Sequence, residues 1–307
     1  MTHSMASITL FSPAGVLTKT APLRLAQRRL KSWGYDVQID EAATARRQRF
    51  AGDDDTRLAA LHRVAQAAPS IALATRGGYG LTQLLERIDW KLMRRSVEQG
   101  TRWVGHSDMT ALQLGLIAQS GVGAGSITWA GPLAVDDFGR SEEAGGVDEV
   151  TRDCFIEAMS GALEAVGFRT EAGFDGLDVK GTLWGGNLAM VMSLMGTPWW
   201  PRIKGGILYL EDVNDHPYRI ERCLLQLHQA GVLAAQKAVL LGAFSGYRPA
   251  AHDKGYSMKT VVARLREACR TPLLTGLPFG HVNPKVTMPV GAQVHLLVDG
   301  RNALIGW

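Results

Sequence analysis

The residues with the clearest chemical potential lie around Ser107, where a short apolar run ends. The string Gly-His-Ser-Asp at 105–108 follows this run, and a helical pattern begins at Met109. A strand, a sharp turn and a helix with serine at the turn place the hydroxyl above the sheet edge, beside the positive helix end. This pattern predicts the nucleophile of a serine hydrolase. A strand end with a helix N-cap is the alternative, because Met109 replaces the second glycine of the usual signature.

A second glycine-rich turn lies upstream of the serine. A buried-strand pattern at 70–75 runs into Arg-Gly-Gly-Tyr-Gly at 76–80, before a helical pattern resumes. Glycines after a strand leave backbone N–H groups uncovered, and such groups can hold the negative oxygen of a tetrahedral intermediate. The predicted donors are the N–H groups of Gly78 and of Asp108, the residue after the serine. A plain turn or a phosphate cradle is the alternative, although the stretch lacks the Lys-Ser/Thr ending of a P-loop.

A serine hydroxyl needs a base, and among the eight histidines His281 is the best candidate. It lies in a loop dense in turn residues, just after an apolar strand-like segment. A surface histidine is the alternative interpretation. His106 is the neighbour of the serine, but adjacent strand residues point to opposite faces, so we expect its ring to point away from the hydroxyl.

The carboxylate that would orient the base is predicted at Glu211. It ends the apolar run at 206–210, and acids at strand C-termini of α/β sheets lie where ligand sites form. The alternative interpretation of this acidic segment is that Asp212 or Asp215 caps the next helix. The paired acids also allow a metal interpretation, but no cluster has metal-ligand spacing, so no metal site is predicted.

Three further residues are candidates for substrate binding. The guanidinium of Arg76 suits a terminal carboxylate, although an arginine beside a turn is often solvated. Trp184 could supply apolar area and Asn187 hydrogen bonds in a cleft, although tryptophan is often a core or interface residue.

Several short motifs occur in a fixed order along the chain. They are Ser-Pro-Ala-Gly at 12–15, Arg-Gly-Gly-Tyr-Gly at 76–80, Gly-His-Ser-Asp at 105–108, Trp-Gly-Gly-Asn-Leu at 184–188, Leu-Glu-Asp at 210–212 and Gly-His at 280–281. In this order and spacing the sequence resembles the LD-carboxypeptidase family of serine peptidases, which acts in murein recycling and includes the microcin C self-immunity peptidases. The resemblance spans nearly the whole chain.

The resemblance implies a triad of Ser107, Glu211 and His281, and an oxyanion hole consistent with Gly78 and Asp108. It implies release of the terminal D-Ala from murein tetrapeptide, at the bond after the L-centre of diaminopimelate, through an acyl-enzyme. No cofactor is expected, and a homodimer is expected from the family alone. Two alternatives stay open: hydrolysis of a peptidyl or aminoacyl nucleotide, with aromatic residues stacking a base near Trp184, and a non-catalytic muropeptide-binding protein.

Strand-like and helical patterns alternate up to about Pro132, which predicts a parallel sheet flanked by helices, flavodoxin- or amidotransferase-like. We expect an N-terminal α/β domain at 1–135, a linker or mobile loop at 136–150, and a second, smaller mixed α/β domain at 151–307. The serine then belongs to the first domain and the other triad residues to the second. The active site is therefore predicted between the domains, where their movement could gate activity.

Composition narrows the class of protein further. The 307 residues are 46% hydrophobic, enough for a large core, and no stretch approaches the roughly 20 apolar residues of a membrane span. No secretory signal is visible at 1–13, so a cytoplasmic protein is expected. The three cysteines fit reduced thiols. The net charge of +4 suits a small acidic substrate, and the basic residues at 24–31 are spaced as a solvated helix face, so no nucleic-acid or membrane partner is predicted.

Overall fold

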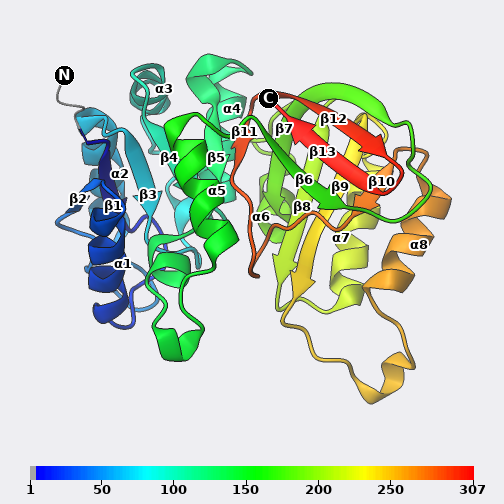
Figure 1. Cartoon of the computed structure of the whole chain (residues 1–307), viewed down its shortest axis with the longest axis horizontal. Helices are drawn as coiled ribbons and strands as arrows, with labels where there is room; N and C mark the ends of the chain where they lie inside the picture. Colours follow the sequence, from blue (N-terminus) through cyan, green and yellow to red (C-terminus); the bar gives the residue numbers. More distant parts are fainter. Residues whose placement is uncertain (1–4) are drawn as a thin grey trace.

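The computed structural model describes residues 5–307, so the first four residues of the segment 1–13 lie outside the described residues. The first sheet has the strand order β11-β5-β4-β3-β1-β2 (Figure 1). Its strands are β1 (Ser7–Phe11), β2 (Asp36–Ile39), β3 (Ile71–Ala74), β4 (Arg102–Gly105), β5 (Thr128–Ala130) and β11 (Met288–Val290). All pair in parallel except β11, which runs antiparallel to β5. The order 2-1-3-4-5 is that of flavodoxin-like sheets, so the predicted class is confirmed.

Helices cover both faces of this sheet. The helices of the chain are α1 (Ala21–Ser32), α2 (Asp54–Ala67), α3 (Trp90–Glu98), α4 (Met109–Ser120), α5 (Glu149–Ser160), α6 (Leu188–Leu194), α7 (Pro217–Gln229) and α8 (Met258–Ala268). Short helical turns lie at η1 (Leu81–Gln83), η2 (Ala124–Ser126), η3 (Ala134–Phe138), η4 (Glu142–Ala144) and η5 (Ala251–Asp253). Apolar side chains of α1 and α5 share one buried cluster with β1, whereas α2, α3 and α4 contribute to the cluster on the other face.

The second sheet has the order β10-β9-β8-β7-β12-β13-β6 and lies beside the first (Figure 1). Its strands are β6 (Ala165–Arg169), β7 (Asp178–Asn187), β8 (Ile207–Val213), β9 (Ala238–Ser245), β10 (Leu273–Thr275), β12 (Gln293–Asp299) and β13 (Asn302–Gly306). Strands β7 to β10 are parallel, and β12, β13 and β6 continue the sheet antiparallel. The second unit is therefore mixed α/β, as predicted, and its sheet has one strand more than the first sheet, seven against six.

Two elements cross the boundary that we expected near residue 150. Helix α5 packs Phe155 into the cluster of the first sheet, and β11 extends that sheet although it follows most of the second unit. The segment expected as a linker contains η3 and η4, and Arg29 of α1 donates a 3.0 Å hydrogen bond to the carbonyl of Phe138 and pairs with Glu142 at 2.6 Å. The chain thus enters the first unit twice.

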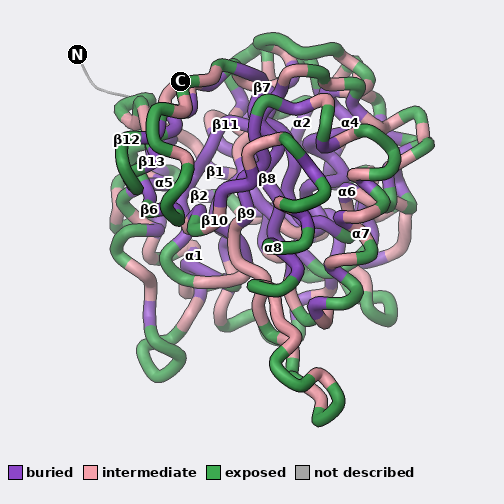
Figure 2. The backbone as a smooth tube through the Cα atoms, turned by 90° about the vertical axis from the view of Figure 1, so that its right-hand side faces the viewer, coloured by how far each residue is buried: buried purple, intermediate pink, exposed green. Residues whose placement is uncertain are grey.

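Helix α4 lies between the two units and connects their cores. Its residues from Met109 to Ile117 are all buried, and one apolar cluster joins this helix to α6 and to strands of both sheets. A helix that is apolar on every side needs neighbours on every side. The backbone tube shows the same distribution, with buried residues concentrated in the middle and exposed loops around them (Figure 2). Among the described residues, no helix has both the length and the apolar character needed to cross a membrane.

The helix starts follow local capping chemistry, with one difference from expectation. Asp53 and Asp148 accept hydrogen bonds from the third residues of α2 and α5, as N-caps do. The expectation that Asp212 or Asp215 caps the helix after β8 is wrong, because His216 occupies the N-cap of α7. Asp212 accepts instead from the Ala189 N–H at the start of α6, at 3.0 Å, because parallel strands bring the ends of β7 and β8 together.

Candidate active site

Ser107 occupies the turn between β4 and α4 with φ of 62°, the left-handed region that costs a non-glycine residue about 1–2 kcal/mol. The backbone continues directly into the helix, because the Thr110 N–H donates to the Ser107 carbonyl at 3.0 Å. The side chain is only partly buried, whereas both of its neighbours are buried. Strain of this kind persists where the surroundings fix the turn, and it accumulates at functional sites. The predicted nucleophile elbow therefore has the expected backbone.

The glycine turn after β3 lies against the serine. A Cβ added to Gly77 would lie 2.6 Å from Cβ and from Oγ of Ser107, and 3.6 Å from the backbone nitrogen of Asp108. The Gly15 N–H donates a 3.1 Å hydrogen bond to the Gly77 carbonyl and so fixes this glycine turn. Gly78 follows with φ of 102°, a conformation that favours glycine. Gly77 thus lies against Ser107 and near the backbone nitrogen of Asp108, and the role of the Gly78 and Asp108 N–H groups as oxyanion donors stays a prediction.

We expect Gly77→Ala to lower kcat/KM for the peptide hydrolysis predicted from the sequence about 100-fold or more. The reason is that a methyl group cannot fit against Ser107 without displacing it. The measurement compares kcat/KM and the thermal midpoint with those of the wild type. Gly167→Ala is the matched control, since a Cβ there meets nothing closer than 3.8 Å. Wild-type activity of Gly77→Ala would contradict the close approach of this turn to the nucleophile.

The side chain of Asp108 hydrogen-bonds the backbone just after the glycine turn. It is 1% exposed and accepts a 2.8 Å hydrogen bond from the Leu81 N–H, which ties the start of α4 to η1. Burial raises the pKa of Asp108 to about 6, although hydrogen bonds from the 80–81 backbone and the charge of Arg57 oppose the shift. The folded protein therefore holds this proton more tightly than the unfolded chain does.

The folded protein binds a proton at Asp108 more tightly than the unfolded chain does, so the protonated carboxyl stabilises the fold. This stabilisation is complete below about pH 4 and is lost as the pH rises through about 6. The wild type should lose free energy of unfolding as the pH rises from 4 to 7, whereas Asp108→Asn has no carboxyl to titrate at this position. We therefore expect the free energy of unfolding of Asp108→Asn to rise relative to that of the wild type over this range, by up to about 3 kcal/mol. Urea unfolding at pH 4 to 7 measures the difference, with the exposed Asp299→Asn as the control. A difference that stays constant over this pH range would contradict the assignment.

Glu211 and His281 are brought together as predicted. The His281 Nδ1–H donates to Glu211 Oε2 at 2.8 Å, and Glu211 is fully buried. A carboxylate can only accept, so in the neutral ring the proton lies on Nδ1 and Nε2 keeps its lone pair. The second carboxylate oxygen accepts from Asn187 Nδ2 at 3.2 Å. This orientation leaves the lone pair of His281 Nε2 unused by Glu211.

The imidazole of His281 lies beside the serine turn. Its ring centroid is 4.9 Å from that of His106, the residue before Ser107, and both rings approach edge to face. Among the described residues no hydrogen bond joins Ser107 to His281. His106 hydrogen-bonds the Gly131 carbonyl through Nδ1 at 2.8 Å, and burial, with the charges of Lys285 and His281, lowers its pKa well below the ordinary value. Burial therefore favours the neutral form of the His106 ring.

A hollow of about 410 Å³ opens next to His281. Its lining includes charged residues that the sequence analysis did not select as site candidates. In the sequence, they could be seen only as the acidic pair Asp136 and Asp137 in the expected linker and as Lys285 shortly after the Gly-His motif. Burial raises the pKa of Asp136 in this hollow, while Arg76 opposes the shift. The lining residues are His106, Asp136, Asp137, Arg140, His281, Val282, Asn283 and Lys285.

The three predicted substrate-binding residues have different surroundings. Arg76 is partly buried, donates to the Val16 carbonyl at 2.9 Å and has a buried Nε without a partner, so it retains capacity to donate. Asn187 is 7% exposed, and its amide contacts Glu211 and the start of α6. Trp184 is 1% exposed and donates its indole N–H to Gln236 at 3.0 Å. The Trp184 ring is thus part of the core, and nothing in this position favours stacking on a base.

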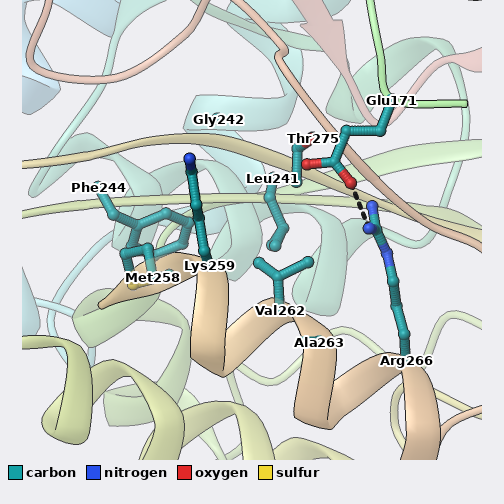
Figure 3. Close-up of a pocket in the computed structure, with 10 residues that line it drawn as sticks. All are labelled: Glu171, Leu241, Gly242, Phe244, Met258, Lys259, Val262, Ala263, Arg266 and Thr275. Atoms are coloured by element: carbon teal, nitrogen blue, oxygen red, sulfur yellow. Dashed lines mark hydrogen bonds and ion pairs between the residues drawn. The ribbon is translucent and has the colours of Figure 1, made fainter. Parts of the chain in front are cut away.

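A second hollow, of about 450 Å³, lies between β9 and α8 (Figure 3). Leu241, Phe244 and Val262 form an apolar wall, and the ion pair of Glu171 with Arg266 lies at one end (Figure 3). None of the proposed triad residues lines this hollow. Of the predicted triad residues, His281 lines the first hollow.

Both halves of the chain match models of one family of serine peptidases. Residues 8–126 match the LD-carboxypeptidase N-terminal domain, and residues 180–296 match the LD-carboxypeptidase C-terminal domain. Together with the α/β architecture, these matches define the class as a serine-type carboxypeptidase. The chain belongs to the LD-carboxypeptidase family.

Individual relatives agree with this assignment. The crystal structure of muramoyltetrapeptide carboxypeptidase from Oxalobacter formigenes is 36% identical, with a TM-score of 0.86 and 98% of each chain covered. The murein tetrapeptide carboxypeptidase of Pseudomonas aeruginosa is 28% identical over 92% of this chain and 91% of the relative. The microcin C7 self-immunity protein MccF of Escherichia coli is 24% identical over 76% of this chain and 72% of the relative.

Proposed function

We propose that this protein is a serine LD-carboxypeptidase that releases the terminal D-Ala from murein tetrapeptide. The observation that carries the proposal is the hydrogen bond from His281 Nδ1 to the buried Glu211, which leaves Nε2 free beside the strained turn of Ser107. The likeness to murein tetrapeptide carboxypeptidases over nearly the whole chain supports the substrate class.

In the proposed acylation step, Ser107 Oγ attacks the carbonyl carbon after the L-centre of diaminopimelate, and His281 Nε2 takes the hydroxyl proton. The carbonyl oxygen becomes negative and accepts hydrogen bonds from the N–H groups of Gly78 and Asp108. His281 then gives its proton to the leaving amine, so free D-Ala departs and an ester with Ser107 remains. Glu211 holds the ring and stabilises the imidazolium during both transfers.

In the proposed deacylation step, water replaces D-Ala in the site. His281 takes a proton from the water as it attacks the ester, the same donors hold the oxyanion, and the proton returns to Ser107 Oγ as the tripeptide leaves. The backbone donors need no rearrangement between the two halves of the reaction.

Substrate selection by a carboxypeptidase requires a cation for the terminal carboxylate. Arg76 is the proposed partner, because it follows β3 at the start of the glycine turn and forms no ion pair among the residues that the structure describes. Asn187 is proposed to contact the substrate from the end of β7, in addition to its bond with Glu211. Trp184 was a third candidate, and its burial favours a packing role.

The test is incubation of the purified protein with murein tetrapeptide, with free D-Ala and the tripeptide measured by mass spectrometry. A peptidyl nucleotide and an aminoacyl nucleotide are assayed in parallel. Tripeptide formation supports the proposal. Cleavage of the nucleotide conjugates alone would replace the substrate class, and binding of tetrapeptide without cleavage of any compound would favour a binding protein.

The family resemblance also carries three predictions about context. They are a role in cell-wall recycling, a cytoplasmic location and a homodimer. Each stays a prediction that rests on the resemblance and on the sequence.

A further inference from the structure

The loop that carries His281 crosses from one unit to the other. It leaves β10 of the second sheet at residue 276 and reaches β11 of the first sheet at residue 288. On the side of the second unit, the Phe279 carbonyl accepts from the Ala243 N–H at 2.8 Å, and His281 bonds Glu211. The position of His281 relative to Ser107 therefore depends on how the far end of this loop is attached to the first unit.

That attachment centres on Lys285. Its backbone N–H donates to Thr151 Oγ1 at 2.9 Å, and its ammonium Nζ donates to Asp137 Oδ1 at 2.7 Å. The other oxygen of Asp137 accepts from the Leu133 N–H at 2.7 Å, which fixes this carboxylate within η3. Only three residues, 282–284, thus separate His281 from Lys285, whose charge is anchored in the first unit.

The pair of Asp137 and Lys285 is unusual among the ion pairs of the described residues. Its side chains are 5% and 4% exposed, whereas every other such pair has at least one side chain with clearly greater exposure. Desolvation offsets most of the attraction in a buried pair, so a well-packed apolar pair would stabilise a fold equally well. Stability alone therefore does not account for this buried pair, and its location beside the hollow at His281 points to another role.

Asp137, Lys285 and His281 line the same hollow. Lys285 acts on His106 and Asp136, which both line the hollow. The titratable and charged groups around His281 come from every element packed there. They are Glu211 of β8, His106 after β4, Arg76 after β3, Asp136 and Asp137 of η3, Arg140 after η3, and Lys285 of the same loop.

We infer that Asp137 and Lys285 are positioning residues for His281: the pair anchors the loop to the first unit, and Asp137 cancels the lysine charge beside the base. This role rests on the proposed function, in which His281 becomes an imidazolium at each proton transfer. An uncompensated Lys285 disfavours that cation, whereas an uncompensated Asp137 favours it.

The test uses the full chain and follows the His281 ring by NMR over pH, with the signal assigned by its loss in His281→Gln. Asp137→Asn is expected to lower the titration midpoint by about half to one pH unit, and Lys285→Met to raise it by a similar amount. The double variant Asp137→Asn/Lys285→Met is expected to return to the wild-type midpoint. A purely structural pair predicts no shifts of opposite sign, so shifts of the same sign, or none, overturn the charge-balancing role.

The kinetic readout tests the anchoring role. In the double variant we expect kcat to fall about 10- to 100-fold while KM stays within about threefold of the wild type, because the loop loses an anchor while substrate contacts remain. A wild-type kcat overturns this role. If the single variants do not fold, the double variant carries both tests, because it buries no unpaired charge. A His281 titration midpoint that differs from the wild type, or an unchanged kcat, then overturns the proposal.

The two readouts separate this inference from the proposed function. If the wild type cleaves no murein tetrapeptide, the proposed substrate is wrong, yet the His281 midpoints of the single variants still test the charge balance. If the wild type cleaves tetrapeptide and the midpoints do not move in opposite directions, the substrate stands and this inference falls.

Discussion

Ser107→Ala is expected to abolish release of D-Ala, with kcat falling by about 10⁴-fold or more, while the fold stays intact. The reason is that Ser107 is the proposed site of the acyl-enzyme, whereas the substitution removes only one oxygen atom from the fold. Alanine at this position meets the same backbone strain as serine, because φ of 62° penalises any residue with a Cβ. The measurement is tripeptide formation by mass spectrometry, with the thermal midpoint as the check on folding.

Ser193→Ala provides the matched control, because Ser193 is an exposed residue of α6 whose hydroxyl donates to the Met190 carbonyl of the same helix at 2.7 Å. It is expected to keep wild-type kcat. Equal turnover by Ser107→Ala and the wild type would remove Ser107 as nucleophile, and the mechanism proposed above would fall with it.

Glu211→Gln is expected to lower kcat by about 10³- to 10⁴-fold with little change in volume. One carboxylate oxygen accepts from His281 and the other from Asn187, so both positions require acceptors. A glutamine has one NH₂ group, which must face either the Asn187 amide or the His281 ring. If it faces His281, the ring proton moves to Nε2 and the base is lost.

The pH profile and kcat of Glu211→Gln on murein tetrapeptide are compared with those of Glu267→Gln, an exposed position on α8. The control is expected to match the wild type. Retention of full kcat by Glu211→Gln over the whole pH range would show that this carboxylate does not orient the base.

Local pattern predicted those parts of the fold that local chemistry determines. The strand at Ile71–Ala74 is a short apolar run followed by the glycine turn, and the pattern at 70–75 predicted it to within one residue at each end. The serine turn was predictable for the same reason, since strand, glycine and helix follow one another within a few residues. The pairing of Glu211 with His281 came from chemistry and resemblance, and the structure places the two side chains in contact.

Other features depend on partners far away in the sequence and could not be predicted from local pattern. Strand β11 is only three residues long and contains Pro289, so it has no periodic signal, and its place beside β5 follows from tertiary packing. Lys285 and Asp137 are 148 positions apart. Each looks like an ordinary surface charge in sequence, and only the fold buries them against each other.

The return of the chain to the first sheet has a mechanical consequence. The backbone passes between the units three times: after α5, between β10 and β11, and between β11 and β12. At the last passage, the Gly291 N–H donates to Leu183 of β7 at 2.7 Å immediately after β11 ends. A two-lobed protein that opens as a clamshell rotates about a flexible hinge, but here rotation would pull β11 out of its sheet. We therefore expect the two halves of the site to stay assembled, so that peptides enter and leave past side chains and loops at its rim.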